Sequence, residues 1–178
     1  SSTSGMETSV KTSELLAHRA KVVVPARMEA IEAAIEAKDF NTFGEITIKD
    51  SNQFHACCLD TYPPIFYLND NSRHIIQLMS RYNAHCGTVK AAYTFDAGPN
   101  AVIYCLKDDV AEILGLVKQY LPNETPPADG QGFYRGLSSE EPAAISADLI
   151  KAIDMPSVTD GIRYVLHTEP GPGPIVTD

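Results

Sequence analysis

Asp96 is the side chain in this sequence best placed to do chemistry. It follows Lys90–Phe95, a run rich in Tyr, Thr and Phe that predicts a strand, and it precedes Ala97-Gly98-Pro99-Asn100, which predicts a turn. A carboxylate at a strand end can act as a general base where a cleft opens beside it. Asp is also a common turn residue that bonds its own backbone, so local rules leave a structural role open.

Three other groups of residues favour packing or loop roles over chemistry. His55 lies near Cys57 and Cys58, but four zinc ligands at the usual spacing are missing, so we expect a helix-packing His and buried thiols. Tyr93, Phe95 and Tyr104 of the predicted strands are expected in the core. Gly171-Pro172-Gly173-Pro174 lacks the Lys and the following helix of a phosphate loop, and it predicts an irregular segment.

Helical periodicity, caps and breakers predict the elements that position Asp96. Five helical segments are expected, at Glu7–Lys38 with a kink or break at Pro25, from Asp39 as N-cap to Leu59, from Asn69-Asp70 to Gly87, at Asp108–Leu121 and at Ala147–Ile153. Three β-rich runs predict strands, at Lys90–Phe95, Ala101–Leu106 and Ile162–His167. The Pro/Gly/Ser-rich segment 122–142 predicts a mobile loop.

This order indicates an α+β fold, in which helices pack on one face of a small antiparallel sheet. The 178 residues fit a single domain spanning 1–178, and with 44% apolar and 21% charged residues the chain is long enough to bury a core.

The charge balance argues against several classes of function. Acidic residues outnumber basic ones by 23 to 14, which gives a net charge of −9, and no Lys/Arg block could follow a nucleic-acid backbone. The same balance would repel a polyanionic substrate unless cations came from another domain or from Mg²⁺. No run is apolar enough for a membrane span.

The cysteines and the first residues suggest a cytoplasmic protein cut from a longer chain. Four Cys residues without a C-x-x-C pair are expected to be reduced thiols. The chain begins Ser1-Ser2-Thr3, without an initiator Met, and enters a helical pattern at once. We therefore expect a piece of a longer protein.

Several segments together resemble the mevalonate diphosphate decarboxylases of eukaryotic type, a branch of the GHMP kinase superfamily. The residues that carry the resemblance are Tyr93-Thr94-Phe95-Asp96-Ala97-Gly98-Pro99-Asn100-Ala101, Asp50-Ser51-Asn52-Gln53-Phe54-His55-Ala56, Cys58–Ile65, Tyr67-Leu68-Asn69-Asp70 and Ser1-Ser2-Thr3-Ser4-Gly5-Met6. They span most of residues 1–106 in the family's order and spacing.

The resemblance implies a reaction and a site. Family members transfer the γ-phosphoryl group of Mg-ATP to the tertiary 3-hydroxyl of mevalonate 5-diphosphate, and they then release phosphate and CO₂ to give isopentenyl diphosphate for isoprenoid and sterol synthesis. Asp96 matches the catalytic aspartate. Ser2, Met6 and Ala97 match substrate-binding positions, with Ser2 near the phosphate-bearing end.

The resemblance also implies a fold, partners and cofactors. The fold would be the GHMP C-terminal domain, a ferredoxin-like sandwich of helices on an antiparallel sheet. ATP and Mg²⁺ would be held mainly by an N-terminal domain that this sequence lacks, no metal ligand is expected in this chain, and the enzyme would be a cytoplasmic homodimer. The chain alone would be inactive.

Two classes of alternative stay open at this point. One is a related enzyme that decarboxylates a monophosphate or only phosphorylates position 3. The other is a non-catalytic ferredoxin-like module that binds a ligand or a partner.

Overall fold

The computed structural model describes residues 2–136, 141–171 and 173–174, except for the side chain of Ser2. Its internal contacts divide the chain into two compact units, Ser1–Val110 with Ser146–Met155, and Ala111–Ile145 with Pro156–Asp178. The expectation of one domain over the whole chain therefore stays a prediction. The first unit contains Asp96.

A long helical arm opens the first unit. It consists of α1 (Ser2–Thr12), α2 (Glu14–His18), a π-helical turn (Arg19–Val23) and α3 (Val24–Glu36). The break that we expected at Pro25 falls instead at Ser13, whose side chain accepts a hydrogen bond from Leu16 N–H and caps α2. The chain stays helical through Pro25, because the π-helical turn leads into α3 with Pro25 in its first turn, where the absent N–H is tolerated.

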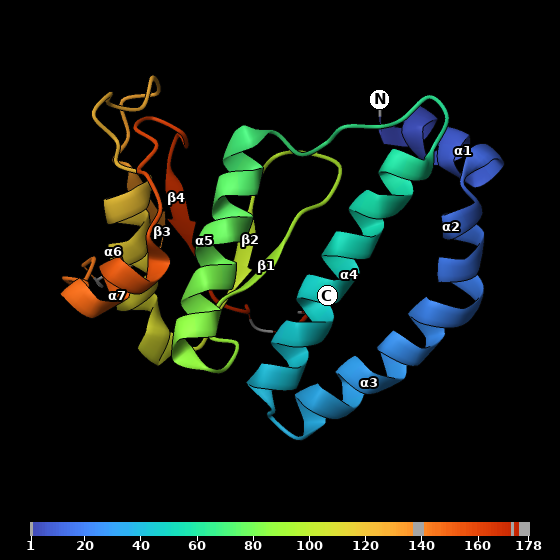
Figure 1. Ribbon diagram of the computed structural model, residues 1–178, viewed down its shortest axis with the longest axis horizontal. Coiled ribbons are helices and arrows are strands. Elements are labelled where there is room, and N and C mark those ends of the chain that lie inside the picture. The colour runs from blue at the N-terminus through green and yellow to red at the C-terminus, as the bar shows by residue number, and fades with distance from the viewer. Residues whose placement is uncertain (1, 137–140, 172, 175–178) are drawn as a thin grey trace, which may run out of the picture. The chain divides into compact units, whose positions relative to one another are not determined.

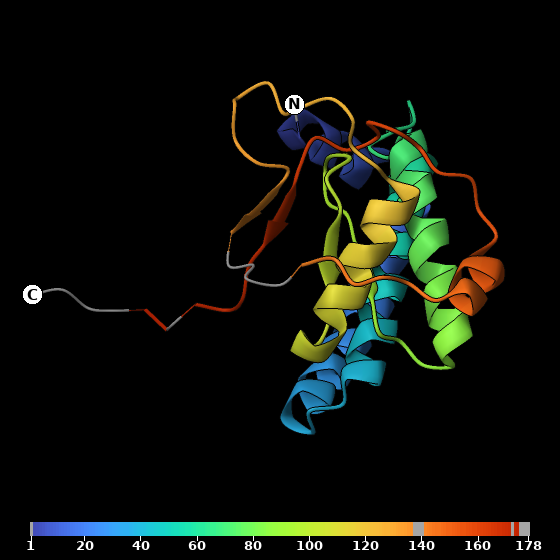
Figure 2. The ribbon, with the colours of Figure 1, turned by 90° about the vertical axis from the view of Figure 1, so that its left-hand side faces the viewer.

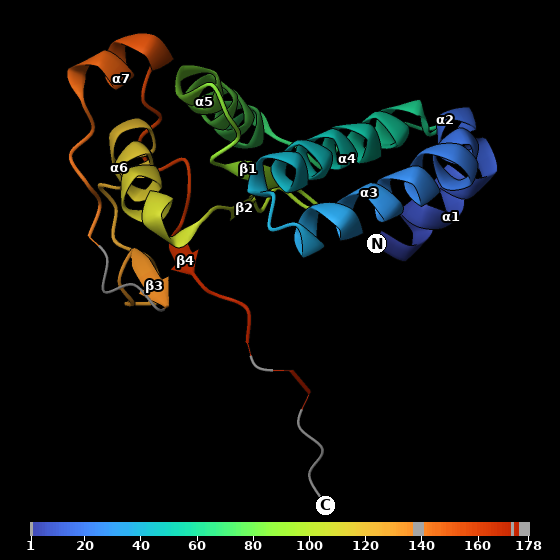
Figure 3. The same ribbon diagram turned by 90° about the horizontal axis from the view of Figure 1, so that it is seen from below.

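Two further helices have the caps that the sequence predicts. Asp39 caps α4 (Phe40–Asp60) by accepting from Thr42 N–H at 3.0 Å. Asn69 caps α5 (Asp70–Cys86), and Gly87 ends it in the left-handed conformation with φ of 68°. Figure 1 shows α4 running antiparallel to the helical arm, and α3 and α4 remain side by side in Figure 3.

The two strands beside Asp96 form an antiparallel pair, as predicted, but they are shorter than expected. Strand β1 is Ala92–Thr94 and strand β2 is Val102–Tyr104, with Tyr93 opposite Ile103. Helices α4 and α5 both contact β1, and α7 (Ala147–Ile153) packs on α5. The α+β class and the small antiparallel sheet are confirmed.

The second unit contains most of α6 (Val110–Tyr120), which follows a 3₁₀ turn at Lys107–Asp109. It also contains a parallel strand pair, of which the sequence predicted only the second strand, within Ile162–His167. Strands β3 (Tyr134–Gly136) and β4 (Val165–His167) lie side by side in Figure 2. Strand β3 therefore lies inside the segment 122–142 for which we predicted only a loop. Residues 137–140 of that segment are outside the described residues.

Side-chain hydrogen bonds and a cation–π contact join segment 122–142 to the rest of the second unit. The carboxylate of Asp160 accepts from the N–H groups of Glu124 and Thr125, and Arg135 pairs with Asp129 while its guanidinium lies 4.0 Å from the centre of the Tyr164 ring.

None of the helices in the described part of the chain is long and apolar enough to cross a membrane.

Candidate functional site

The carboxylate of Asp96 is exposed at the end of the first strand. Asp96 follows β1 by two residues, and within the described part of the chain its carboxylate takes part in no hydrogen bond or ion pair. A Cβ added at Gly98 would meet the Asp96 Oδ1 atom only at 3.9 Å. The turn that follows does not engage this carboxylate, which is available to another molecule.

The residue before Asp96 is held from both sides by α4. Phe95 N–H donates to the Ser51 hydroxyl oxygen at 3.1 Å, and Phe95 C=O lies 3.2 Å from His55 Nε2. Ser51 and His55 are separated by one helical turn, so they lie on the same face of α4. Both are buried, with exposed fractions of 4% and 7%, as is Phe95.

The state of the His55 imidazole follows from this contact. A carbonyl oxygen can only accept a hydrogen bond, so His55 Nε2 must carry the proton. Burial lowers the pKa of His55, and this outweighs the hydrogen bond to Phe95 and the negative charge of Asp96, which both favour the protonated form. His55 is therefore a neutral donor at neutral pH.

Aromatic contacts connect this strand end to α1. The His55 ring lies 6.3 Å from the Phe95 ring and 6.5 Å from the Tyr67 ring, measured between centroids. The Tyr67 hydroxyl would be 2.9 Å from a Cβ at Gly5, so the absence of a side chain at Gly5 gives Tyr67 room beside α1. Beside it is an open hollow of about 470 Å³, lined by Ser4, Gly5 and Thr8 of α1 and by Pro64, Ile65 and Tyr67.

The other predicted site residues are less fully placed. Ala97 is exposed next to Asp96, and Met6 is 62% exposed on α1 and does not line the hollow. The backbone of Ser2 begins α1, but its side chain is outside what the structure describes. Ala97 lies beside Asp96 because it follows it in the sequence. Among the interactions of the described residues, none joins Met6 to Asp96 or Ala97.

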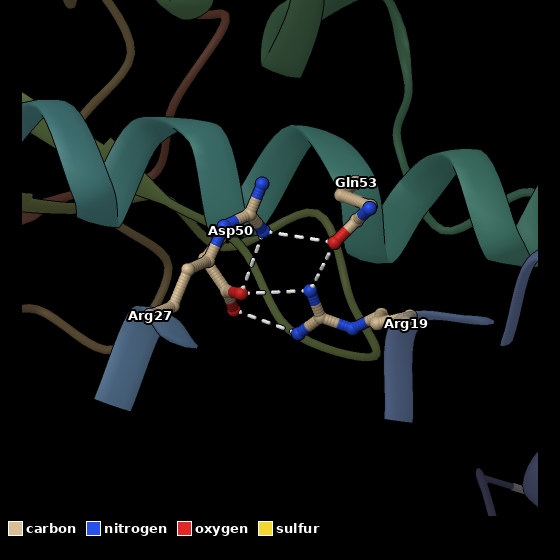
Figure 4. A network of polar contacts seen from close by, with 4 residues as sticks. All are labelled: Arg19, Arg27, Asp50 and Gln53. Atoms are coloured by element: carbon tan, nitrogen blue, oxygen red, sulfur yellow. Dashed lines mark hydrogen bonds and ion pairs between the residues drawn. The ribbon is translucent and has the colours of Figure 1, made fainter. Parts of the chain in front are cut away.

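On the side of α4 that faces away from Ser51 and His55, a network of hydrogen bonds and ion pairs connects the helix to the helical arm (Figure 4). The guanidinium of Arg19 donates two bonds to the Asp50 carboxylate at 2.7 and 2.8 Å, and Arg27 Nη1 donates to the same carboxylate at 2.9 Å. Both arginines also donate to Gln53 Oε1. The hydrogen bond from Arg19 is the largest effect that lowers the pKa of Asp50, which keeps this carboxylate charged.

The cysteines near His55 behave as packing residues. Cys57 and Cys58 are 4% and 6% exposed, and burial raises the pKa of both thiols, which makes thiolates scarce at neutral pH. Residues 2–136, 141–171 and 173–174 bring together no group of three or more His, Cys, Asp or Glu side chains that could hold a metal ion.

Sequence reasoning missed the grip of Ser51 and His55 on Phe95. Its signal was a stripe of polar residues four apart on α4, Thr47, Ser51 and His55, all of which are buried. Buried polar side chains need partners, so such a stripe predicts bonds to a neighbouring backbone.

Comparison with known proteins gives one consistent family. Residues 1–177 match the model of the mevalonate 5-diphosphate decarboxylase C-terminal domain. A diphosphomevalonate decarboxylase of Danio rerio is 53% identical over 177 residues, which cover 99% of this chain and 43% of that protein.

Solved structures agree with this match. The mevalonate diphosphate decarboxylase from Trypanosoma brucei is 32% identical, with a TM-score of 0.71 over 93% of this chain and 42% of that one. MDDEF in complex with MVAPP, AMPPCP and magnesium is 27% identical, with a TM-score of 0.61 over 66% of this chain and 35% of that one. The chain spans less than half the length of these relatives, and it belongs to the mevalonate 5-diphosphate decarboxylase C-terminal domain family.

Proposed function

We propose that this chain is the C-terminal part of an ATP-dependent decarboxylase that converts mevalonate 5-diphosphate to isopentenyl diphosphate, ADP, phosphate and CO₂. Family membership and the names of the relatives support the activity. The observation that carries the proposal is the exposed Asp96 carboxylate, which makes no hydrogen bond or ion pair within the described part of the chain. It directly follows Phe95, whose backbone is held by two buried side chains just beyond the end of β1.

Asp96 would act on the tertiary 3-hydroxyl of the substrate. A carboxylate within hydrogen-bond reach orients this crowded, weakly acidic alcohol and accepts its proton as the phosphoryl group arrives. The Ser2 hydroxyl would donate to an anionic oxygen at the phosphate-bearing end, while Met6 and Ala97 would line the same pocket.

ATP and Mg²⁺ would be bound mainly by the N-terminal domain of the same enzyme. A related structure contains AMPPCP, an ATP analogue, and magnesium, which supports the cofactors for the family. The net charge of −9 supports their placement outside this chain, because a half-site of this charge repels two polyphosphates. A cytoplasmic homodimer in sterol synthesis completes the proposal and rests on the family resemblance alone.

The substitution Asp96→Asn in the full-length enzyme tests the proposal. It keeps the shape of the side chain but removes the proton acceptor, so kcat for CO₂ release should fall about 10²–10⁴-fold while KM stays nearly unchanged. The melting temperature should equal that of the wild type, because in the structure the carboxylate bonds to nothing among the described residues.

Asp108→Asn is the matched control, since Asp108 is another exposed carboxylate of the same unit. It should leave turnover unchanged. A wild-type enzyme that releases no CO₂ from mevalonate 5-diphosphate would refute the proposed reaction. A destabilised Asp96→Asn protein with normal turnover per folded molecule would return Asp96 to a structural role.

A further inference from the structure

We propose that Ser51 and His55 are positioning residues that fix the direction in which Asp96 leaves the strand. This inference rests on the proposed function, because it assumes that Asp96 acts on the substrate. Ser51 and His55 are themselves buried. Both act through Phe95, which separates Asp96 from β1.

The geometry constrains both peptide groups that flank Phe95. Its N–H belongs to the peptide shared with Thr94, and its C=O belongs to the peptide shared with Asp96. Ser51 holds the first at 3.1 Å and His55 holds the second at 3.2 Å. With both peptide planes held, the two backbone dihedral angles of Phe95 are set, and these angles place the Cα of Asp96.

Burial makes this grip stronger than a surface contact. Strand β1 ends at Thr94, so the backbone groups of buried Phe95 lie beyond the paired residues and need other partners. Each group left unsatisfied in this setting carries a desolvation cost, so the backbone does not leave its two partners easily. The backbone that carries the exposed carboxylate is therefore held rigidly.

Neighbouring residues of α4 make further bonds that hold this part of the helix in place. Tyr93 Oη donates to Asn52 Oδ1 at 3.1 Å, and Asp50 and Gln53 hold the two arginines of the helical arm (Figure 4). Asp50 and Gln53 of α4 therefore bond to the arm, whereas Ser51, Asn52 and His55 bond to Tyr93 and Phe95. Rotation of α4 about its axis would break contacts on both sides.

Variants of the full-length enzyme separate a positioning role from a merely structural one. His55→Phe keeps an aromatic ring but removes the donor, and Ser51→Ala removes the acceptor for Phe95 N–H. His55→Gln retains an amide N–H near the position of Nε2 and serves as the conservative rescue. Thr47→Val is the control, because Thr47 is a buried hydroxyl on the same face of α4 that bonds only to Phe43 C=O of its own helix.

We expect kcat to fall about 10- to 100-fold in His55→Phe and in Ser51→Ala, with KM for mevalonate 5-diphosphate within twofold of the wild type, since misplacement of a reacting group costs about this much. His55→Gln should recover most of the loss. Thr47→Val should change the melting temperature but not kcat per folded molecule.

A double-mutant cycle with Asp96→Asn gives the sharpest readout. If Ser51 and His55 act through the Asp96 carboxylate, their substitution should have little further effect on the residual rate of Asp96→Asn. Fully additive losses, or a kcat in His55→Phe and Ser51→Ala that matches Thr47→Val at equal folded fraction, would overturn the inference. A failure of the proposed function would look different, because the wild-type enzyme would then not turn over at all.

Discussion

The Asp96 carboxylate is exposed, whereas the residue directly before it is buried and bonded on both sides. This contrast suits a base that must meet a second molecule. A free carboxylate on a floppy turn would lose orientation, and one bonded to its own turn could not accept a proton. At the scale of single residues, the carboxylate that we propose as the reacting group is thus separate from the groups that hold its backbone.

His55 should make the stability of the chain depend on pH. Burial lowers its pKa in the folded state, so below about pH 6.5, the ordinary value, the unfolded chain binds a proton more readily than the folded chain. The free energy of unfolding should therefore fall as the pH drops below about 6.5, down to the folded-state pKa. In His55→Gln this part of the pH dependence should be absent.

Urea denaturation between pH 7.5 and 5.5 measures the effect. The curve of unfolding free energy against pH should be flatter for His55→Gln than for the wild type. Parallel curves for wild type and His55→Gln would contradict the expected change in the protonation of His55.

At the scale of single residues, the sequence predicts the role of a side chain better than it predicts the partner that the side chain bonds to. Asp96 stands out because a strand pattern ends in a turn, and His55, Cys57 and Cys58 were expected to be packing residues, as the structure shows. The partner of His55 could not be predicted, because Phe95 is 40 residues away and only the packing of α4 on β1 brings them together.

Helix α4 is the element on which the site is built. Its side chains hold the arm through Asp50 and Gln53, and they hold Phe95 through Ser51 and His55. Buried Gly44 lets the helix backbone come close to Val89 and Ala92. Because a Cβ at position 44 would meet Val89 and Ala92, we expect this glycine to set how closely α4 packs on β1.

Gly44→Ala should destabilise the chain even though alanine is the better helix former. A Cβ at this position would lie 2.5 Å from Val89 Cγ1 and 3.3 Å from Ala92 Cβ. Overpacking of about 1–3 kcal/mol should exceed the gain of about 1 kcal/mol from helix propensity. Chemical denaturation of the 178-residue chain measures the balance.

Val89→Ala supplies the matched test of this mechanism. It removes the atom that the new Cβ would strike, so in the double variant Gly44→Ala should cost less than it does alone. If the two changes were simply additive, the clash with Val89 would not be the cause. A stabilised Gly44→Ala protein would show that α4 can move away from β1 without loss.

Elements with strong local signals were predicted well. Asp39, Asn69 and Gly87 fix the ends of α4 and α5 through local capping bonds, and α7 has the predicted bounds. The π-helical turn before Pro25 and the pairing of β3 with β4 were missed. The first depends on a hydrogen-bond shift of one residue, and the second joins segments about thirty residues apart without a hairpin turn between them.

At the scale of the whole molecule, the charge distribution sets what the chain can bind. The sequence carries 23 acidic and 14 basic residues, and several of the basic ones are already paired with carboxylates. The paired cations are Arg19, Arg27, Lys49, Arg73, Lys90 and Arg135. Because the chain as a whole carries a net charge of −9, it should repel a polyphosphate.

The 178-residue chain by itself should therefore fold but not bind Mg-ATP with micromolar affinity, and it should release no CO₂ from mevalonate 5-diphosphate. Isothermal titration of the chain with Mg-ATP measures the first, and the full-length enzyme under the same conditions is the positive control. Raising the salt concentration from about 0.01 M to about 0.1 M shortens the screening length from about 30 Å to about 10 Å, so it should weaken the repulsion without creating a site. Micromolar binding by the chain alone at either salt concentration would place an ATP site within these residues. It would refute the proposal that the N-terminal domain binds most of the ATP and Mg²⁺.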